Sequence, residues 1–96
     1  MVLGISYKKD SSDLRNSPSL EIYKLLRKKY NKVFFNDDFV KKISLNGKKV
    51  LSTKISNYSY LKQFDYVIYL TNHTYYNKKM ILSFSNKIYD TRGSFK

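Results

Sequence analysis

Residues 3–18 read LGISYKKDSSDLRNSP and contain three successive patterns within one short stretch. An apolar run typical of a buried strand comes first, and a charged loop with two carboxylates and a guanidinium follows it. Ser17-Pro18 then indicates a helix start, because serine suits the N-cap and proline the first helical position. A strand, a polar loop and a helix N-terminus together favour phosphate, since free N–H groups and the helix dipole attract anions. No glycine-rich phosphate loop is present, so loop side chains would have to supply much of the positive charge.

The remaining chain alternates between patterns of strands and helices. Strands are expected at about 2–7, 32–36, 66–70 and 87–89, and helices at 18–30, 57–63 and 75–84. The stretch 41–56 is harder to interpret: Asn46-Gly47 indicates a turn and residues 49–52 a short extra strand. This alternation predicts a single Rossmann-like α/β domain, a parallel sheet with helices on both faces in three layers.

Each predicted strand of the sheet ends in polar residues. These strand ends are Tyr7-Lys8, Asn36-Asp37, Thr71-Asn72-His73 and Asp90-Thr91-Arg92. The carboxyl ends of parallel strands meet at one edge of the sheet, where such folds bind ligands. Lysine and arginine pair with phosphate oxygens, and the ring of Tyr7 offers a face to a base or sugar. We therefore expect a ligand crevice at this edge.

Several of these polar residues have a second interpretation. Asp37 and Asp38 could accept a ribose hydroxyl or could cap a turn. His73, the single histidine, could act as a general acid or base or could cap a turn. Asp13 and Arg15 could form an ion pair that fixes the loop internally. The ten tyrosines and six phenylalanines could stack on bases, but their spacing favours packing in the core.

Composition restricts the class of protein. Ninety-six residues make one domain with one modest core. The net charge of +12 favours an anionic partner, although scattered lysines can also simply be solvated. Without cysteine there is no disulfide, thiolate metal site or thiol nucleophile. No run is long and apolar enough to span a membrane, and no signal-peptide pattern is present, so we expect a cytoplasmic protein.

The first stretch also resembles a known family. The pattern Gly4-x-x-Tyr7-Lys8-x-Asp10-x-x-Asp13-x-Arg15-x-Ser17-Pro18 is similar to the opening of the C-terminal, nucleotide-sugar-binding domain of the UDP-glucose/GDP-mannose dehydrogenase family. Residues 36–40, 70–73 and 90–93 follow in the family's order, so the resemblance covers nearly the whole chain. The Thr-x-His and Asp-Thr-Arg endings look more like members that oxidise UDP-N-acetylhexosamines than those that oxidise UDP-glucose. Asp38 stands where the family usually has proline.

The resemblance implies specific ligands. Tyr7 and Lys8 would contact the uridine and phosphate part of a UDP-sugar. Arg92 would contact the sugar nucleotide too, with a position across a subunit interface as one option. Arg15 would reach NAD that is bound mainly by another domain. Family members oxidise the sugar C6 hydroxyl to a carboxylate in two NAD-dependent steps, with a catalytic cysteine, for polysaccharide precursor synthesis.

This chain lacks much of that machinery. It has no cysteine, and its glycines, at positions 4, 47 and 93, are too far apart for a G-x-G-x-x-G fingerprint. The first strand begins almost at Met1, as expected of a domain from a longer protein. Residues 1–96 are therefore interpreted as the UDP-sugar-binding C-terminal domain of an NAD-dependent dehydrogenase. The NAD-binding and central dimerisation domains would be its partners, and the full enzyme would be a homodimer. The alternative is a small basic nucleic-acid-binding domain, whose affinity would fall steeply with salt.

Overall fold

The computed structural model describes residues 1–91 and contains a four-stranded parallel sheet. Its strands are β1 (Val2–Leu3), β2 (Phe35–Asn36), β5 (Val67–Tyr69) and β6 (Ile88–Asp90). They lie in the order β2-β1-β5-β6, and every neighbouring pair is parallel. The predicted parallel α/β sheet is confirmed.

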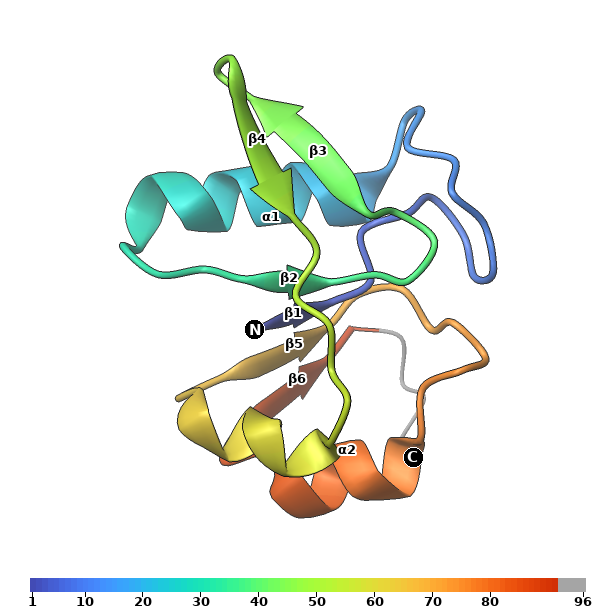
Figure 1. The fold of residues 1–96 in the computed structure, drawn as a ribbon, viewed down its shortest axis with the longest axis vertical. Coiled ribbons are helices and arrows are strands. Elements are labelled where there is room, and N and C mark those ends of the chain that lie inside the picture. The colour runs from blue at the N-terminus through green and yellow to red at the C-terminus, as the bar shows by residue number, and fades with distance from the viewer. Residues whose placement is uncertain (92–96) are drawn as a thin grey trace.

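Helical segments and a hairpin cover the two faces of this sheet (Figure 1). One face carries α1 (Pro18–Lys29) and the antiparallel hairpin of β3 (Lys42–Leu45) and β4 (Lys48–Leu51). The other face carries the 3₁₀ helix η1 (Tyr58–Gln63) and α2 (Lys78–Phe84). The three predicted layers are therefore present.

The sheet divides the apolar core into two clusters. Val2 packs with Tyr23 and Phe35 on the α1 side, whereas Leu3 packs with Leu61 and Ile81 on the α2 side. Successive strand residues point to opposite faces, so neighbouring positions serve different clusters. Both faces of β1 are consequently buried, as expected of a central strand in a parallel sheet.

The chain changes its direction of travel across the sheet next to β1. The crossover through α1 leads from β1 to β2 on one side, and the chain then returns to place β5 on the other side. The connections that leave the carboxyl ends of β1 and β5 therefore diverge. In open α/β sheets this is the point where ligands bind.

The first strand is shorter than predicted, because Gly4 ends it. Gly4 has a φ of +86°, and a Cβ atom built on it would lie 2.5 Å from the Cβ of Thr71. The backbone N–H groups of Leu70 and Thr71 both donate to the Leu3 carbonyl, at 3.0 and 3.3 Å. After Gly4 the loop leaves the sheet, so the prediction of a strand over 2–7 is wrong beyond residue 3.

Helix α1 begins where the sequence predicts. The Ser17 Oγ accepts a hydrogen bond from the Leu20 N–H at 3.1 Å and donates to the Ile5 carbonyl at 2.8 Å. Within the helix Tyr23 is fully buried, whereas Ile22 and Tyr30 are exposed. The cap therefore joins the helix N-terminus to the loop that follows β1.

Other boundaries also differ from the predictions. Residues 42–45 form a strand that the pattern did not indicate, paired with β4 through a turn in which Asn46 and Gly47 both have positive φ. Such a turn matches the twist of a two-stranded hairpin. Helix α2 begins at Lys78 instead of residue 75, since the Asn77 side chain caps it by accepting from the Met80 N–H at 3.1 Å.

Within residues 1–91, no helix is both long enough and apolar enough to cross a bilayer.

Candidate functional site

The loop that follows β1 is held by the ends of two neighbouring strands. The N–H groups of Ile5 and Ser6 donate to Asp37 Oδ2 at 2.9 and 3.2 Å. The Thr71 Oγ1 lies 2.9 Å from the Ser6 carbonyl, to which it donates. Residues from the carboxyl ends of β2 and β5 thus fix the backbone directly before Tyr7.

Asp37 is the centre of this arrangement, and its side chain is fully buried. Besides the two backbone donors, its Oδ2 lies 2.8 Å from His73 Nε2, and its Oδ1 accepts from the Phe39 N–H at 3.0 Å. A buried carboxylate needs such donors to replace the lost water. This geometry favours the turn-capping alternative for Asp37, because its oxygens are already engaged inside the protein.

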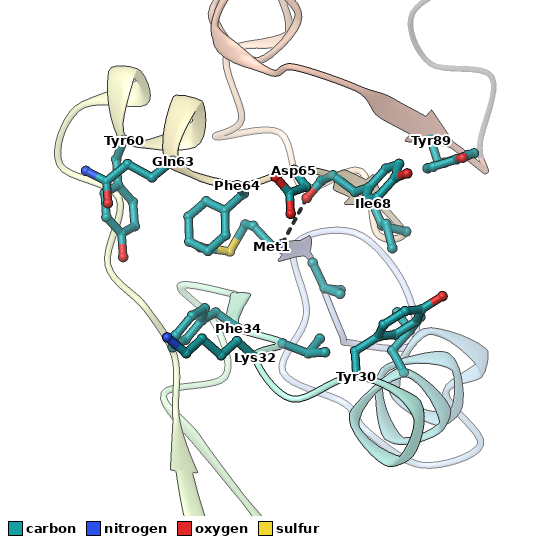
Figure 2. Close-up of a pocket in the computed structure, with 14 residues that line it drawn as sticks. Met1, Tyr30, Lys32, Phe34, Tyr60, Gln63, Phe64, Asp65, Ile68 and Tyr89 are labelled. Carbon is teal, nitrogen blue, oxygen red and sulfur yellow. Dashed lines mark hydrogen bonds between the residues drawn. The ribbon is translucent and has the colours of Figure 1, made fainter.

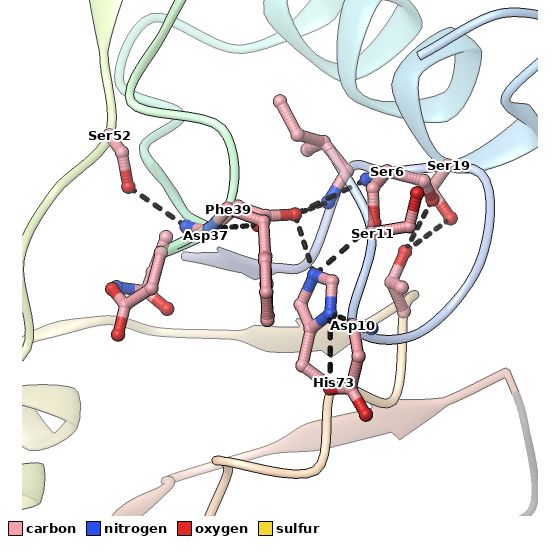
Figure 3. Close-up of polar contacts among 12 residues, drawn as sticks. Ser6, Asp10, Ser11, Ser19, Asp37, Phe39, Ser52 and His73 are labelled. Atoms are coloured by element: carbon pink, nitrogen blue, oxygen red, sulfur yellow. Dashed lines mark hydrogen bonds and ion pairs between the residues drawn. The ribbon is translucent and has the colours of Figure 1, made fainter. Parts of the chain in front are cut away.

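The ring of His73 is also fully buried, and its bonds define its tautomer (Figure 3). The Asp10 N–H donates to His73 Nδ1 at 2.8 Å. A backbone amide can only donate, so Nδ1 carries the lone pair and Nε2 carries the proton. That Nε2–H faces Asp37 Oδ2, with the Ser6 Oγ 3.2 Å away. The Ser6 hydroxyl donates to the Lys8 carbonyl at 3.0 Å, which leaves a lone pair toward the ring.

Ser6, His73 and Asp37 do not form a nucleophilic triad. In a triad the nucleophile and the carboxylate bond opposite ring nitrogens, whereas here both face Nε2. The buried ring has no surface to offer to a ligand. His73 is therefore neither a solvent-facing acid or base nor a simple turn cap, and it cross-links three strand ends.

A second link joins the β1 loop to the β5 loop. The carboxylate of Asp10 accepts from the Thr74 N–H at 2.8 Å and lies 2.9 and 3.0 Å from the Thr74 Oγ1. The backbone hydrogen bond from Thr74 is the main cause that lowers the pKa of Asp10. Asp10 has a φ of +57°, a conformation uncommon for residues other than glycine. Bonds at its N–H and at its carboxylate hold it there.

Tyr7 and Lys8 extend from this fixed backbone into solvent. Tyr7 is 47% exposed, and Lys8 is exposed as well. The Tyr7 N–H donates to the Asp13 carbonyl at 2.7 Å, so the far side of the loop is closed too. The predicted roles of Tyr7 and Lys8 as ligand contacts stay predictions, and the structure leaves both side chains free to make those contacts.

Arg15 and Asp13 form the internal ion pair that the sequence left as one alternative. The Arg15 Nε lies 3.1 Å and its Nη2 3.3 Å from the two oxygens of Asp13. Hydrogen bonds from Arg15 lower the pKa of Asp13. The Arg15 side chain is nevertheless 88% exposed, so the guanidinium remains at the surface. Arg92, the other predicted ligand residue, lies outside the described residues.

Sequence reasoning missed a group of side chains that supports the end of β2. The Asp38 N–H donates to the Tyr75 hydroxyl at 2.8 Å, and that hydroxyl donates to Asn36 Oδ1 at 3.0 Å. The Tyr76 hydroxyl donates to the Asn36 carbonyl at 2.8 Å. Burial raises the pKa of Tyr75. Asp38 stands where the resembled family usually has proline, and it uses an N–H that proline lacks. The adjacent residues Tyr75 and Tyr76 could have indicated this support, but both fell within the helix predicted at 75–84, where tyrosines also fit core packing.

A separate hollow lies at the opposite end of the sheet. It is a groove of about 820 Å³ where the strands begin, lined by Met1, Phe34, Phe64 and Tyr66 among others (Figure 2). A hollow of about 360 Å³ beside Asp38 and Lys41 lies near the carboxyl end of β2. The groove includes Lys32, Gln63 and Asp65 among its aromatic and aliphatic residues, but it lies away from the carboxyl ends of the strands, where open α/β sheets bind ligands. We therefore place the candidate site at the carboxyl ends of the strands and not in this groove.

Fold and site together define a class, a Rossmann-like α/β domain with its polar site at the carboxyl edge of the sheet. The sequence comparison is more specific: residues 1–96 match the model of the UDP-glucose/GDP-mannose dehydrogenase family, UDP binding domain. The chain belongs to this family, as the resemblance predicted.

A solved structure agrees with this assignment. The chain is similar to the UDP-N-acetyl-mannosamine dehydrogenase Cap5O from S. aureus, with 26% identity and a TM-score of 0.67. The match covers 99% of this chain but 22% of that one. No curated protein matches the sequence.

Proposed function

We propose that this chain binds the uridine diphosphate part of a UDP-sugar at the carboxyl edge of its sheet. The observation that carries the proposal is the loop of residues 5–10, whose backbone is bonded to Asp37, Thr71 and His73 while Lys8 and Tyr7 stay exposed. A site prepared in this way loses little conformational entropy when its ligand binds. Membership of the family supports UDP as that ligand.

Each predicted contact has a chemical role in this proposal. The ammonium of Lys8 pairs with diphosphate oxygens as a compact charge, and the guanidinium of Arg92 pairs with them through parallel hydrogen bonds. The ring of Tyr7 lies against the uracil or the ribose. We propose a UDP-N-acetylhexosamine as the substrate, because the likeness to the UDP-N-acetyl-mannosamine dehydrogenase supports the same choice as the Thr71-Asn72-His73 ending.

NAD contacts this chain at Arg15 in the same proposal. The guanidinium is exposed and is aligned by Asp13, which fits an arginine that pairs with a phosphate from outside. With three separated glycines, the chain has no fingerprint of its own to hold the dinucleotide. NAD bound to another domain would supply the hydride acceptor for oxidation of the sugar C6 hydroxyl.

The proposal therefore assigns the rest of the reaction to other parts of the enzyme. The solved relative is much longer than this chain, which covers 22% of it. We propose that an NAD-binding domain, a central dimerisation domain and the catalytic cysteine belong to the same enzyme or to a partner chain. We further propose that the full enzyme is a cytoplasmic homodimer that serves polysaccharide precursor synthesis. Neither comparison supports the nucleic-acid-binding alternative.

The direct test replaces Lys8 and, as a matched control, its neighbour Lys9. Both lysines are exposed on the same loop, so either substitution removes one charge from the same region. Loss of one charge-assisted contact corresponds to roughly tenfold weaker binding. We expect Lys8→Ala to weaken UDP binding by about that factor in calorimetry, and Lys9→Ala to change it by less than about twofold. Equal affinities for both variants and the parent chain would reject the proposed contact.

A further inference from the structure

We infer that His73 is a positioning residue, which holds the loop of residues 6–10 in the conformation that presents Tyr7 and Lys8 to UDP. This inference rests on the proposed function and concerns a residue that the ligand itself does not touch. It follows from where the bonds of His73 go and from the burial of its ring.

The ring joins both ends of the segment that carries Tyr7 and Lys8. Its Nε2 lies 3.2 Å from the Ser6 Oγ, and its Nδ1 accepts from the Asp10 N–H at 2.8 Å. The Ser6 Oγ also donates to the carbonyl of Lys8 at 3.0 Å. Both ends of the segment are therefore bonded to the same histidine ring.

His73 cannot reach a ligand directly. Its side chain has no exposed surface, and aromatic rings pack against it. The ring of Tyr75 is stacked on it at 5.5 Å between centroids and 15° between planes, and the ring of Phe39 lies at 4.9 Å. Any effect of His73 on binding must therefore act through the loop.

Asp37 contributes to the same task because it selects the tautomer of His73. With the proton on Nε2 and bonded to Asp37 Oδ2 at 2.8 Å, Nδ1 is left as an acceptor for Asp10. The unusual φ of Asp10, +57°, is consistent with a residue held in place by its surroundings. The N–H and the carboxylate of Asp10 both have partners on the β5 loop, His73 and Thr74.

Two substitutions separate the two functions of the ring. In His73→Asn the amide oxygen can take the place of Nδ1 and accept from the Asp10 N–H. In His73→Gln the amide nitrogen can take the place of Nε2 and donate to Asp37, but no acceptor remains near Asp10. Ile81→Val serves as the control for lost stability, because Ile81 is a fully buried residue of α2 whose aliphatic side chain cannot hydrogen-bond to the loop.

The test is UDP titration of the parent chain and these three variants, well below their melting temperatures. If the loop holds the binding conformation only one tenth of the time, the apparent affinity falls by about tenfold. We expect a loss of about that size in His73→Gln and a loss of less than about threefold in His73→Asn. Ile81→Val should melt at a lower temperature and bind UDP with unchanged affinity.

Two spectroscopic measurements distinguish positioning from general damage. Nitrogen-15 shifts of the His73 ring should show one protonated nitrogen, Nε2, in the parent chain. Hydrogen exchange at the Asp10 amide should be slow in the parent chain and in His73→Asn, and faster in His73→Gln. Parent-like affinity in His73→Gln overturns the inference. So does equally weak binding in both histidine variants with equally fast exchange at Asp10.

The two claims can fail separately. A parent chain that does not bind UDP overturns the proposed function and, with it, the link between His73 and UDP. In that case the exchange rates at Asp10 still decide whether His73 holds the loop. A parent chain that binds UDP, together with a His73→Gln variant that binds equally well, overturns only the positioning role.

Discussion

Polar residues at the strand ends of this domain have two different tasks. Asp37, His73 and Ser6 are buried and bond to one another and to the loop backbone. Lys8 and Arg15 are exposed and present their charges from that loop. Buried polar groups are stable only when they are hydrogen-bonded, so the first set gives the loop one defined conformation. The second set can then meet a diphosphate without first becoming ordered.

Gly4 is the residue whose replacement should disturb this arrangement most. Its φ of +86° is unfavourable for other residues, and a Cβ would approach the Thr71 backbone within 3 Å. A left-handed backbone costs ~1–2 kcal/mol, and forced repacking costs ~1–3 kcal/mol. We expect Gly4→Ala to lower the free energy of unfolding in urea by about 2–5 kcal/mol.

Gly47 provides the matched control for that substitution. It also has a positive φ, +78°, but no atom lies within 4 Å of the place its Cβ would occupy. Gly47→Ala should therefore cost only the backbone contribution, ~1–2 kcal/mol. If the two alanine variants lose the same stability, the close approach of β1 to Thr71 does not have the importance assigned to it.

Single residues could be predicted where the cause is local. Ser17 as the N-cap and the Asp13–Arg15 pair depend on residues two or three positions apart, and both are present. The pairing of Asp37 with His73 joins residues 36 positions apart. Sequence pattern placed both at the same edge of the sheet, but it could not show that they turn inward to each other. Whether the two side chains point inward or toward solvent depends on the geometry of the loops.

At the level of elements, the hairpin of β3 and β4 extends the α1 side of the core. Ile43 is 7% exposed and packs in the cluster with Tyr23, whereas Leu51 on the partner strand is 67% exposed. The short pattern KISL did not indicate a strand, because lysine is depleted in strands, and only the turn at Asn46-Gly47 was indicated beside it. The partner strand, indicated at 49–52, was displaced by one residue from the observed 48–51.

We expect only the buried face of this hairpin, which includes Ile43, to contribute measurably to stability. Removing buried methyl groups leaves a cavity, which costs about 2–4 kcal/mol for an isoleucine. We expect a loss of that size in the free energy of unfolding of Ile43→Ala, measured by urea denaturation. Leu51→Ala, at an exposed site on the same hairpin, should change it by less than about 0.5 kcal/mol. An equal loss in both would mean that the hairpin does not pack as described.

Strand and helix lengths illustrate where pattern alone was insufficient. The apolar run of residues 2–7 looks like one strand, but the positive φ of Gly4 turns the chain after Leu3. Helix α2 starts three residues later than its apolar spacing indicates, because Tyr75 and Tyr76 are used to support Asn36. In both cases a contact with a distant segment overrode a local preference.

For the whole molecule, the two ends of the sheet have contrasting chemistry. The carboxyl end brings together buried polar residues and exposed lysine and arginine, and the amino end has the aromatic groove of Figure 2. The excess of 19 basic over 7 acidic residues makes the whole surface attractive to anions. Charge alone therefore cannot localise a ligand, and the loop geometry has to do so.

The most direct test of the central claim is a map of where UDP binds. Backbone amide shifts of the nitrogen-15-labelled chain would be recorded as UDP is added at constant ionic strength. We expect the largest changes in residues 6–10, at the carboxyl end of the sheet, and smaller changes at the same positions when UMP replaces UDP. Changes concentrated at Phe34, Phe64 and Tyr66, in the groove at the other end, would contradict the central claim.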